Sequence, residues 1–313
     1  MRLPVRILAC LTCVFLVSGC HKHSDTPATG ARPVGELSND LPSYLKLAAI
    51  HNDRVTQLEK FRANRVIVGM WYKDADGQAQ QDHVEGSLRF KRPNDVYLYL
   101  QKAGAVDVAI LGSNTDKYWW LNLLEDKQAL VGEHVRFTPD RVGRFAMPVH
   151  PLDLLDLLAI TQVPSYPART HVVHRDASRN AVVMTVPSKF GFRDILFSPG
   201  DYQPIGVAIY DMMGHEIARS VLGEPVSVDI AMVLEKDQPR VASSAEITFA
   251  GSDARAKLTI YSPTTRSWDR RQDRAFDVDY LIEKYSIRDV VNLDETPVEA
   301  IRVPLPSEFG SGL

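Results

Sequence analysis

The feature that most constrains the fold is a succession of short segments in which apolar and polar residues alternate. Val84–Lys91 is the clearest of them, with small or apolar residues at every second position and charged or hydroxyl residues between them. Because successive side chains of a strand point to opposite faces, this pattern predicts an antiparallel strand with one buried and one solvated face. Similar segments follow closely at Val96–Gln101, Val106–Leu111 and Lys117–Leu124. Strands joined by such short turns predict an antiparallel meander rather than an alternation of strands and helices.

Two segments break this rhythm with helical spacing. Apolar residues recur at intervals of three and four in Pro42–Arg62, and either Ser43 or Asp40 is suited to cap the start of a helix there. Pro148–Ile160 is a second, strongly apolar helix. We interpret this second helix as a lid or plug rather than a surface helix, because it has almost no polar face.

Further strands are predicted along the rest of the chain. They are Asn64–Tyr72, His171–Arg175, Ala181–Val186, Phe192–Phe197, Ile205–Asp211, Glu216–Leu222, Ser227–Leu234, Ala245–Phe249, Ala256–Tyr261 and Glu299–Pro304. Phe276–Tyr285 is predicted to be partly helical. The predicted fold class is therefore mainly β with a few helices (α+β), built on a large antiparallel sheet.

The N-terminal segment has the layout of a secretory signal. Arg2 and Arg6 precede an apolar run, Ile7–Val17, which small residues separate from Cys20. The run is shorter than the roughly 20 apolar residues that a membrane-spanning helix needs. Small residues before a cysteine resemble the lipobox of bacterial lipoproteins, in which the cysteine is lipidated and begins the mature chain; an ordinary signal peptide is the alternative. His21, rather than aspartate, follows the cysteine, which by the same resemblance indicates the outer membrane facing the periplasm.

The chain is predicted to have four parts. Residues 1–19 are the lipoprotein signal peptide, 20–39 a flexible polar tether, 40–304 a single folded domain and 305–313 a disordered tail.

Cysteine content and charge exclude several classes of function. Cys10 and Cys13 lie inside the apolar run of the signal, so cleavage removes the only CxxC pair and leaves Cys20 as the acylated residue. Thiol catalysis and cysteine metal sites are then excluded. The formal net charge is −3 and the chain has no long basic block, which indicates that it has no nucleic-acid partner.

Three stretches carry a family resemblance. They are the opening helix leading into NRVIVGMWY (64–72), EGSLRFKRPNDVYLYL (85–100) and RDILFSPGDYQPIGVAIYDMMG (193–214), which ends in an Asp-x-x-Gly hairpin at Asp211–Gly214. Together they resemble the LolA/LolB-like half-barrel superfamily of bacterial envelope lipoproteins. The resemblance implies an incomplete barrel formed by a large curled antiparallel sheet, with an apolar concave inside and helices at its mouth. It also implies binding of acyl chains, lipids or lipoproteins in that cavity, or use of the scaffold to sense lipids.

Candidate residues for lining such a cavity come from the most apolar segments. They are Val66, Val68, Met70, Trp71, Leu98, Leu100, Trp119, Trp120, Leu155 and Leu158. Adjacent residues of a strand, such as Trp119 and Trp120, point to opposite faces, and alternation alone does not say which face is the inner one. Ordinary core packing is the alternative role for all ten.

No pattern indicates a reaction. Ser113 lacks the G-x-S-x-G context of a nucleophile, and His171 and His174 would lie on opposite faces of a strand, where they cannot chelate a metal together. We therefore expect no catalytic residue, no metal and no cofactor, and we expect the protein not to be an enzyme. The leading hypothesis is a lipid-anchored envelope lipoprotein that binds an apolar ligand. The alternatives are a non-catalytic structural or sensor module and a hydrolase whose site the sequence does not reveal.

Overall fold

The computed structural model describes residues 41–73, 78–102, 106–124, 126–138, 141, 149–166, 172–189, 191–251 and 253–296. All of them belong to one compact unit, Val34–Leu313. The predicted signal peptide, the tether, the strand Glu299–Pro304 and the C-terminal tail lie outside the described residues.

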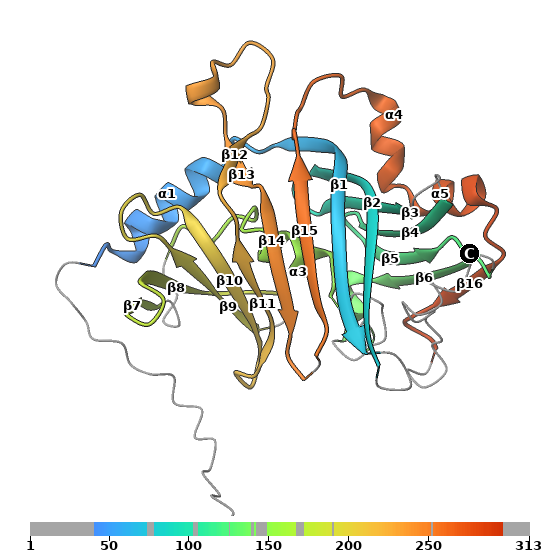
Figure 1. The fold of residues 1–313 in the computed structure, drawn as a ribbon, viewed down its shortest axis with the longest axis horizontal. Helices are drawn as coiled ribbons and strands as arrows, with labels where there is room; N and C mark the ends of the chain where they lie inside the picture. The colour runs from blue at the N-terminus through green and yellow to red at the C-terminus, as the bar shows by residue number, and fades with distance from the viewer. Residues whose placement is uncertain are drawn as a thin grey trace, which may run out of the picture. The chain divides into compact units, whose positions relative to one another are not determined.

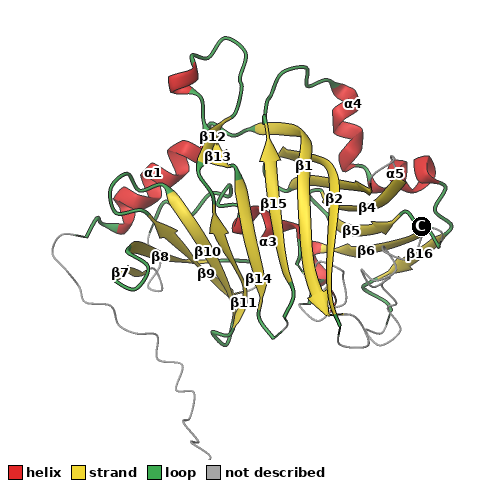
Figure 2. Cartoon of the chain, viewed as in Figure 1, coloured by secondary structure: helices red, strands yellow, loops and turns green. Residues whose placement is uncertain are grey.

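One sheet of fourteen strands dominates the structure (Figures 1 and 2). The strands before the central helix are β1 (Lys60–Lys73), β2 (Ala79–Lys91), β3 (Asp95–Lys102), β4 (Val106–Ser113), β5 (Lys117–Asn122) and β6 (Gln128–Glu133). Those after it are β7 (Val172–Asp176), β8 (Ala181–Pro187), β9 (Gly191–Phe197), β10 (Pro204–Asp211), β11 (Glu216–Leu222), β14 (Ser244–Phe249), β15 (Arg255–Tyr261) and β16 (Asp289–Asn292).

The strand order explains how the sheet curls without closing. It runs β16-β6-β5-β4-β3-β2-β1-β15-β14-β11-β10-β9-β8-β7, so that β16 and β7 are the two free edges of the described sheet. Neighbours are antiparallel except for β16, which runs parallel to β6. The two wings of the sheet recede from the viewer on either side of β1 and β15 in Figure 1. The predicted fold, a large curled antiparallel sheet that forms an incomplete barrel, is confirmed.

A pairing between distant parts of the chain joins the two wings. Strand β1 pairs with β2 on one side and with β15 on the other, with Val66 opposite Ile260 and Val68 opposite Leu258. All four side chains are buried. The middle of the sheet therefore depends on contact between an early and a late segment of the chain.

Helix α1 (Tyr44–Thr56) begins as predicted and ends earlier than predicted. The side chain of Ser43 accepts a hydrogen bond from the backbone N–H of Lys46, which makes it the N-cap. The predicted end at Arg62 is wrong, because β1 begins at Lys60. Phe61 is buried opposite Phe90 of β2. Burial of every second residue in this segment favours a strand over a further turn of helix.

The sheet has an inner and an outer face with separate cores. On the inner face lies α3 (Pro151–Leu157), which is surrounded by the curled sheet (Figure 2). The outer face of β3–β6 packs against the 3-10 turn Arg274–Phe276 and α5 (Val278–Tyr285), and the short helix α4 (Arg270–Asp273) directly precedes this turn. Among the described residues, no helix is long and apolar enough to cross a membrane.

The predicted strand Ser227–Leu234 is wrong. A separate two-stranded sheet forms there from β12 (Pro225–Ser227) and β13 (Arg240–Ala242), and a long connection joins the two strands. Met232 in this connection has a φ of 64°, which a strand does not allow, and its side chain is fully exposed. The apolar residues of this segment therefore belong to a projecting loop and not to a buried strand.

Aromatic rings lie directly over two glycines of the sheet, Gly112 of β4 and Gly132 of β6. A Cβ atom at Gly112 would meet the indole of Trp119 at 2.6 Å, and one at Gly132 would meet the ring of Tyr118 at the same distance. We expect Gly112→Ala to lower the free energy of unfolding by about 1–3 kcal/mol, because the buried indole has to shift. Urea denaturation measures this loss. Gly200→Ala is the matched control, since nothing lies within 4 Å of its Cβ position. Equal losses in the two variants would contradict the steric explanation.

Candidate functional site

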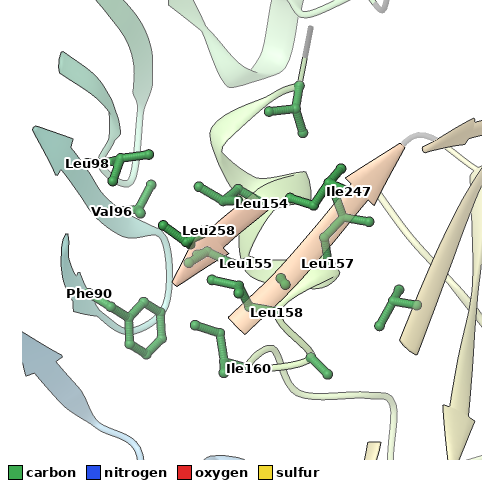
Figure 3. Close-up of a cluster of buried hydrophobic side chains, with 14 of the residues drawn as sticks. Phe90, Val96, Leu98, Leu154, Leu155, Leu157, Leu158, Ile160, Ile247 and Leu258 are labelled. Atoms are coloured by element: carbon green, nitrogen blue, oxygen red, sulfur yellow. The ribbon is translucent and has the colours of Figure 1, made fainter. Parts of the chain in front are cut away.

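The inner face of the sheet is occupied by α3 and the residues that follow it. Five apolar side chains of this segment are almost fully buried: Leu154, Leu155, Leu157, Leu158 and Ile160. Figure 3 shows them among Phe90, Val96 and Leu98 from β2 and β3 and Ile247 and Leu258 from β14 and β15. The helix thus fills the concave side of the curled sheet with apolar side chains.

The structure separates the ten predicted lining residues into two groups. Eight belong to the inner core: Val66, Val68, Met70, Leu98, Leu100, Trp120, Leu155 and Leu158. The other two lie on the outer face. Trp119 packs with Phe276 beneath the C-terminal helices, and Trp71 is half-buried with the guanidinium of Arg255 4.6 Å from its ring. Both follow from alternation along a strand, since their neighbours Trp120 and Met70 point inward.

A chain of hydrogen bonds holds the N-terminal end of α3. The backbone N–H of Leu152 donates to Nδ1 of His150 (3.1 Å), which leaves the proton of this imidazole on Nε2. That N–H donates to Nδ1 of His134 (3.3 Å), and Nε2 of His134 donates to the carbonyl of Asn114 (2.8 Å). Both imidazoles are therefore neutral, and burial lowers the pKa of each. The pair ties the start of α3 to the loop after β4.

A buried arginine holds the other end. Arg193 of β9 donates to the carboxylate of Asp156 and to the hydroxyl of Thr161, and its second terminal nitrogen donates to the carbonyl of Gln162 (2.8 Å). Its side chain is 5 % exposed. Because a charge at such a depth needs a partner, this ion pair fixes the position of α3 relative to β9.

Helix α1 holds the same segment from a third side. Asn52 makes two bonds of 2.8 Å with the backbone of Val163, and Nε2 of His51 donates to the carbonyl of Thr161 (2.8 Å). Arg54 donates to the carbonyl of Ala159 (2.5 Å). The end of α3 therefore lies in a polar clamp while its middle lies in an apolar core.

Two ionisable groups near this clamp have strongly shifted pKa values. Burial, with the positive charge of Arg54 beside it, lowers the pKa of His51 to about 3. Burial raises the pKa of Asp153 on α3 to about 7, although the positive charges of Arg193 and Lys189 act in the opposite direction. His51 is thus neutral and Asp153 is about half protonated at neutral pH.

The polar groups around α3 are arranged as supports for the helix. No group of three or more His, Cys, Asp or Glu side chains within the described part of the chain is arranged to hold a metal ion. The polar groups that the structure brings together hold α3 in place by hydrogen bonds and one ion pair.

Sequence reasoning missed the clamp. His134 and His150 lie in separate segments of the sequence with no ligand-like spacing, and no sequence pattern singles out Arg193 or Arg54. His150 directly precedes Pro151, and a side chain that caps the helix is expected at this position, so its role as the N-cap of α3 could have been predicted. Apart from His51, which lies three residues from Arg54, the partners of the two arginines lie more than 30 residues away in the chain, so no local pattern indicates them.

Comparisons with known proteins give similarities of fold. No family model matches the chain, and no curated protein matches it. A solved LolA superfamily protein from Nitrosomonas europaea is 11% identical over 77% of this chain and 100% of that one, with a TM-score of 0.45. A DUF1329 family protein from Desulfovibrio piger is 9% identical over 74% of this chain and 95% of that one, with a TM-score of 0.48.

Asp153 gives a pH-dependent prediction. Its folded pKa is raised above the ordinary value of 3.8, so the folded state binds the extra proton and stability falls as the pH rises towards 7. We expect Asp153→Asn, which mimics the protonated form, to raise the free energy of unfolding above that of the wild type. This gain is expected to be larger at pH 8 than at pH 5, by on the order of 1–3 kcal/mol. Denaturant unfolding at the two pH values measures the difference. Asp126→Asn, at an exposed position, is the control, and an Asp153→Asn effect independent of pH would contradict the assignment.

Proposed function

We propose that the protein is a lipid-anchored lipoprotein of the cell envelope that binds an apolar ligand on the inner face of its half-barrel. The anchor is the lipid on Cys20, and the protein lies at the outer membrane facing the periplasm. The ligand is an acyl chain, as part of a lipid or of another lipoprotein. Binding involves no covalent chemistry, and the protein acts in lipid or lipoprotein localisation.

The observation that carries this proposal is the way the inner face is covered. Strands from both wings contribute apolar side chains to this face, yet its centre is covered by one helix of seven residues. Burial of apolar surface contributes roughly 25 cal/mol per Å², so an acyl chain in the same place gains what α3 now gains. Exchange between α3 and a ligand of similar width is therefore physically sensible.

The clamp supports the view that α3 is a plug. Its ends are held by ionic and polar contacts, and its middle is held only by apolar packing. Hydrogen bonds and ion pairs require a defined geometry, so these contacts give α3 one specific closed position. A ligand that replaces this apolar packing displaces the middle of α3 and does not require any strand of the sheet to move.

A second function is favoured by the filled interior. Leu154, Leu155 and Leu157 of α3 are at most 1% exposed, which is the packing of an ordinary core. Read in this way, the half-barrel is a rigid scaffold, and the protein is a non-catalytic structural or sensor module of the envelope. The experiments below separate the two.

Ligand occupancy tests the first proposal directly. Native mass spectrometry of the full chain, extracted gently from bacterial membranes, is expected to show a co-purifying lipid in addition to the acyl groups on Cys20. Cys20→Ser is expected to release the protein into the soluble fraction while the non-covalent lipid remains bound. Absence of any non-covalent lipid from both forms would favour the scaffold.

Weakening the clamp is expected to increase ligand binding. Asp156→Asn removes the carboxylate partner of Arg193 and so makes the closed position of α3 less stable. We expect the variant to bind a fluorescent fatty acid several-fold more tightly than the wild type and to unfold at a lower temperature. Fluorescence titration measures the affinity, with Asp126→Asn as the exposed control. Lower stability without tighter binding would contradict the role of α3 as a plug.

A further inference from the structure

A small pocket lies where the end of α3 meets α1 and the two-stranded sheet. Its walls include Arg54, Leu158, Pro204, Leu222, Arg240 and Val241. The space inside has room for about one water-sized group. It is therefore suited to the oxygens of a small polar group and not to a bulky one.

Arg54 is a largely buried cation with only neutral partners. Its guanidinium donates to the carbonyl of Ala159 and to Nδ1 of His51 (3.2 Å). His51 is neutral because its other nitrogen donates to a carbonyl and its pKa is about 3. Burial lowers the pKa of Arg54 to about 10, so the side chain is still positive at neutral pH.

The contrast with Arg193 shows what Arg54 lacks. Both are buried arginines of the same clamp, but Arg193 pairs with Asp156. Across the residues that the structure describes, neither Arg54 nor Arg240 forms an ion pair. Two arginines without carboxylate partners thus line one pocket: Arg54 lies at its buried end, and Arg240 is exposed at its mouth. Because a buried charge is normally paired, Arg54 lacks an anion, and Arg240 adds a second positive charge where an anion would enter.

The apolar walls indicate which kind of anion fits. Leu158 and Val241 belong to the inner core, and Leu222 packs against it. The pocket is therefore continuous with the apolar surface that the proposed ligand would cover. Arginine binds carboxylate and phosphate oxygens through parallel hydrogen bonds. A cationic end next to an apolar face matches an amphiphile with an anionic head.

We propose that Arg54 and Arg240 bind the anionic head, a carboxylate or a phosphate, of the apolar ligand. This inference rests on the proposed function, because it concerns the head of the ligand whose chain lies on the inner face. The pocket accepts the head oxygens at the clamped end of α3, where Leu158 stays in place as a wall, while the chain takes the place of the apolar middle of the helix. The shared chemistry is an oxyanion on an acyl or alkyl chain, from a free fatty acid or from a lipid phosphate.

Three probes with the same twelve-carbon chain test the inference: dodecanoate, dodecyl phosphate and dodecanol, each below its micelle concentration. Isothermal titration of the full chain is expected to show that at least one anion binds about tenfold or more tightly than the alcohol. The stronger of the two anions identifies the source of the head group. Arg240→Gln is expected to reduce this preference to about threefold or less without changing the affinity for dodecanol.

Controls separate the pocket from general effects of charge. Arg270→Gln removes an exposed arginine of α4 and is expected to keep the full preference for the anion. Arg54→Gln is a second variant, checked by circular dichroism, because this residue also holds Ala159. Among the described residues, the side chain of Arg240 forms no hydrogen bond that holds the fold. The Arg240→Gln variant therefore decides the outcome if Arg54→Gln fails to fold.

Equal affinity of the wild type for all three probes would overturn the inference and leave the proposed function standing. If none of the probes binds, the proposed function fails. In that case the pocket is tested alone by thermal unfolding with inorganic phosphate and with acetate. A rise in melting temperature that Arg240→Gln abolishes would support an anion site, and the absence of any rise would overturn it.

Discussion

An open sheet whose concave face is apolar must have that face covered, and in this protein the cover is supplied by the chain itself. The apolar side chains of α3 meet residues from β2, β3, β14 and β15, so one short helix touches both wings of the sheet. The curvature of the sheet and the position of the helix therefore depend on each other. Without such an occupant, water would wet a surface that the strands cannot bury on their own.

The polar contacts around α3 have a different role from the apolar ones. Apolar packing is non-directional and gives the helix a reason to be buried, but it does not fix where the helix starts and ends. The His134–His150 pair and the Arg193–Asp156 ion pair fix these positions, because hydrogen bonds require defined distances and angles. Arg54 extends the same clamp but has no counter-charge among the described residues. The clamp thus lacks a counter-charge at Arg54, and Nε of Arg193 has no hydrogen-bond partner among the described residues.

Alternation along the chain was enough to predict most of the sheet. Val84–Lys91 lies within β2 with every second residue buried, and the observed cap, Ser43, is one of the two residues that the sequence indicates for this position. Alternation failed where apolar letters have another cause. Ser227–Leu234 is a projecting loop with exposed apolar residues, and the segment before Arg62 changes from helix to strand because Phe61 meets Phe90. Alternation also divides Trp119 from Trp120 without indicating which one is inside, since that depends on the side from which α3 packs.

The pairing of β1 with β15 has a consequence for how the chain reaches its folded state. Val66 and Val68 find their partners Ile260 and Leu258 only after nearly the whole chain is available. Until then β1 has one unpaired edge, and the inner face lacks the strands that close around α3. Folding therefore includes a step in which two segments far apart in the sequence have to meet, and such contacts are slow to form. A polypeptide with this topology cannot complete its sheet during most of its synthesis, and the apolar strand β1 needs protection until residues 255–261 have been made.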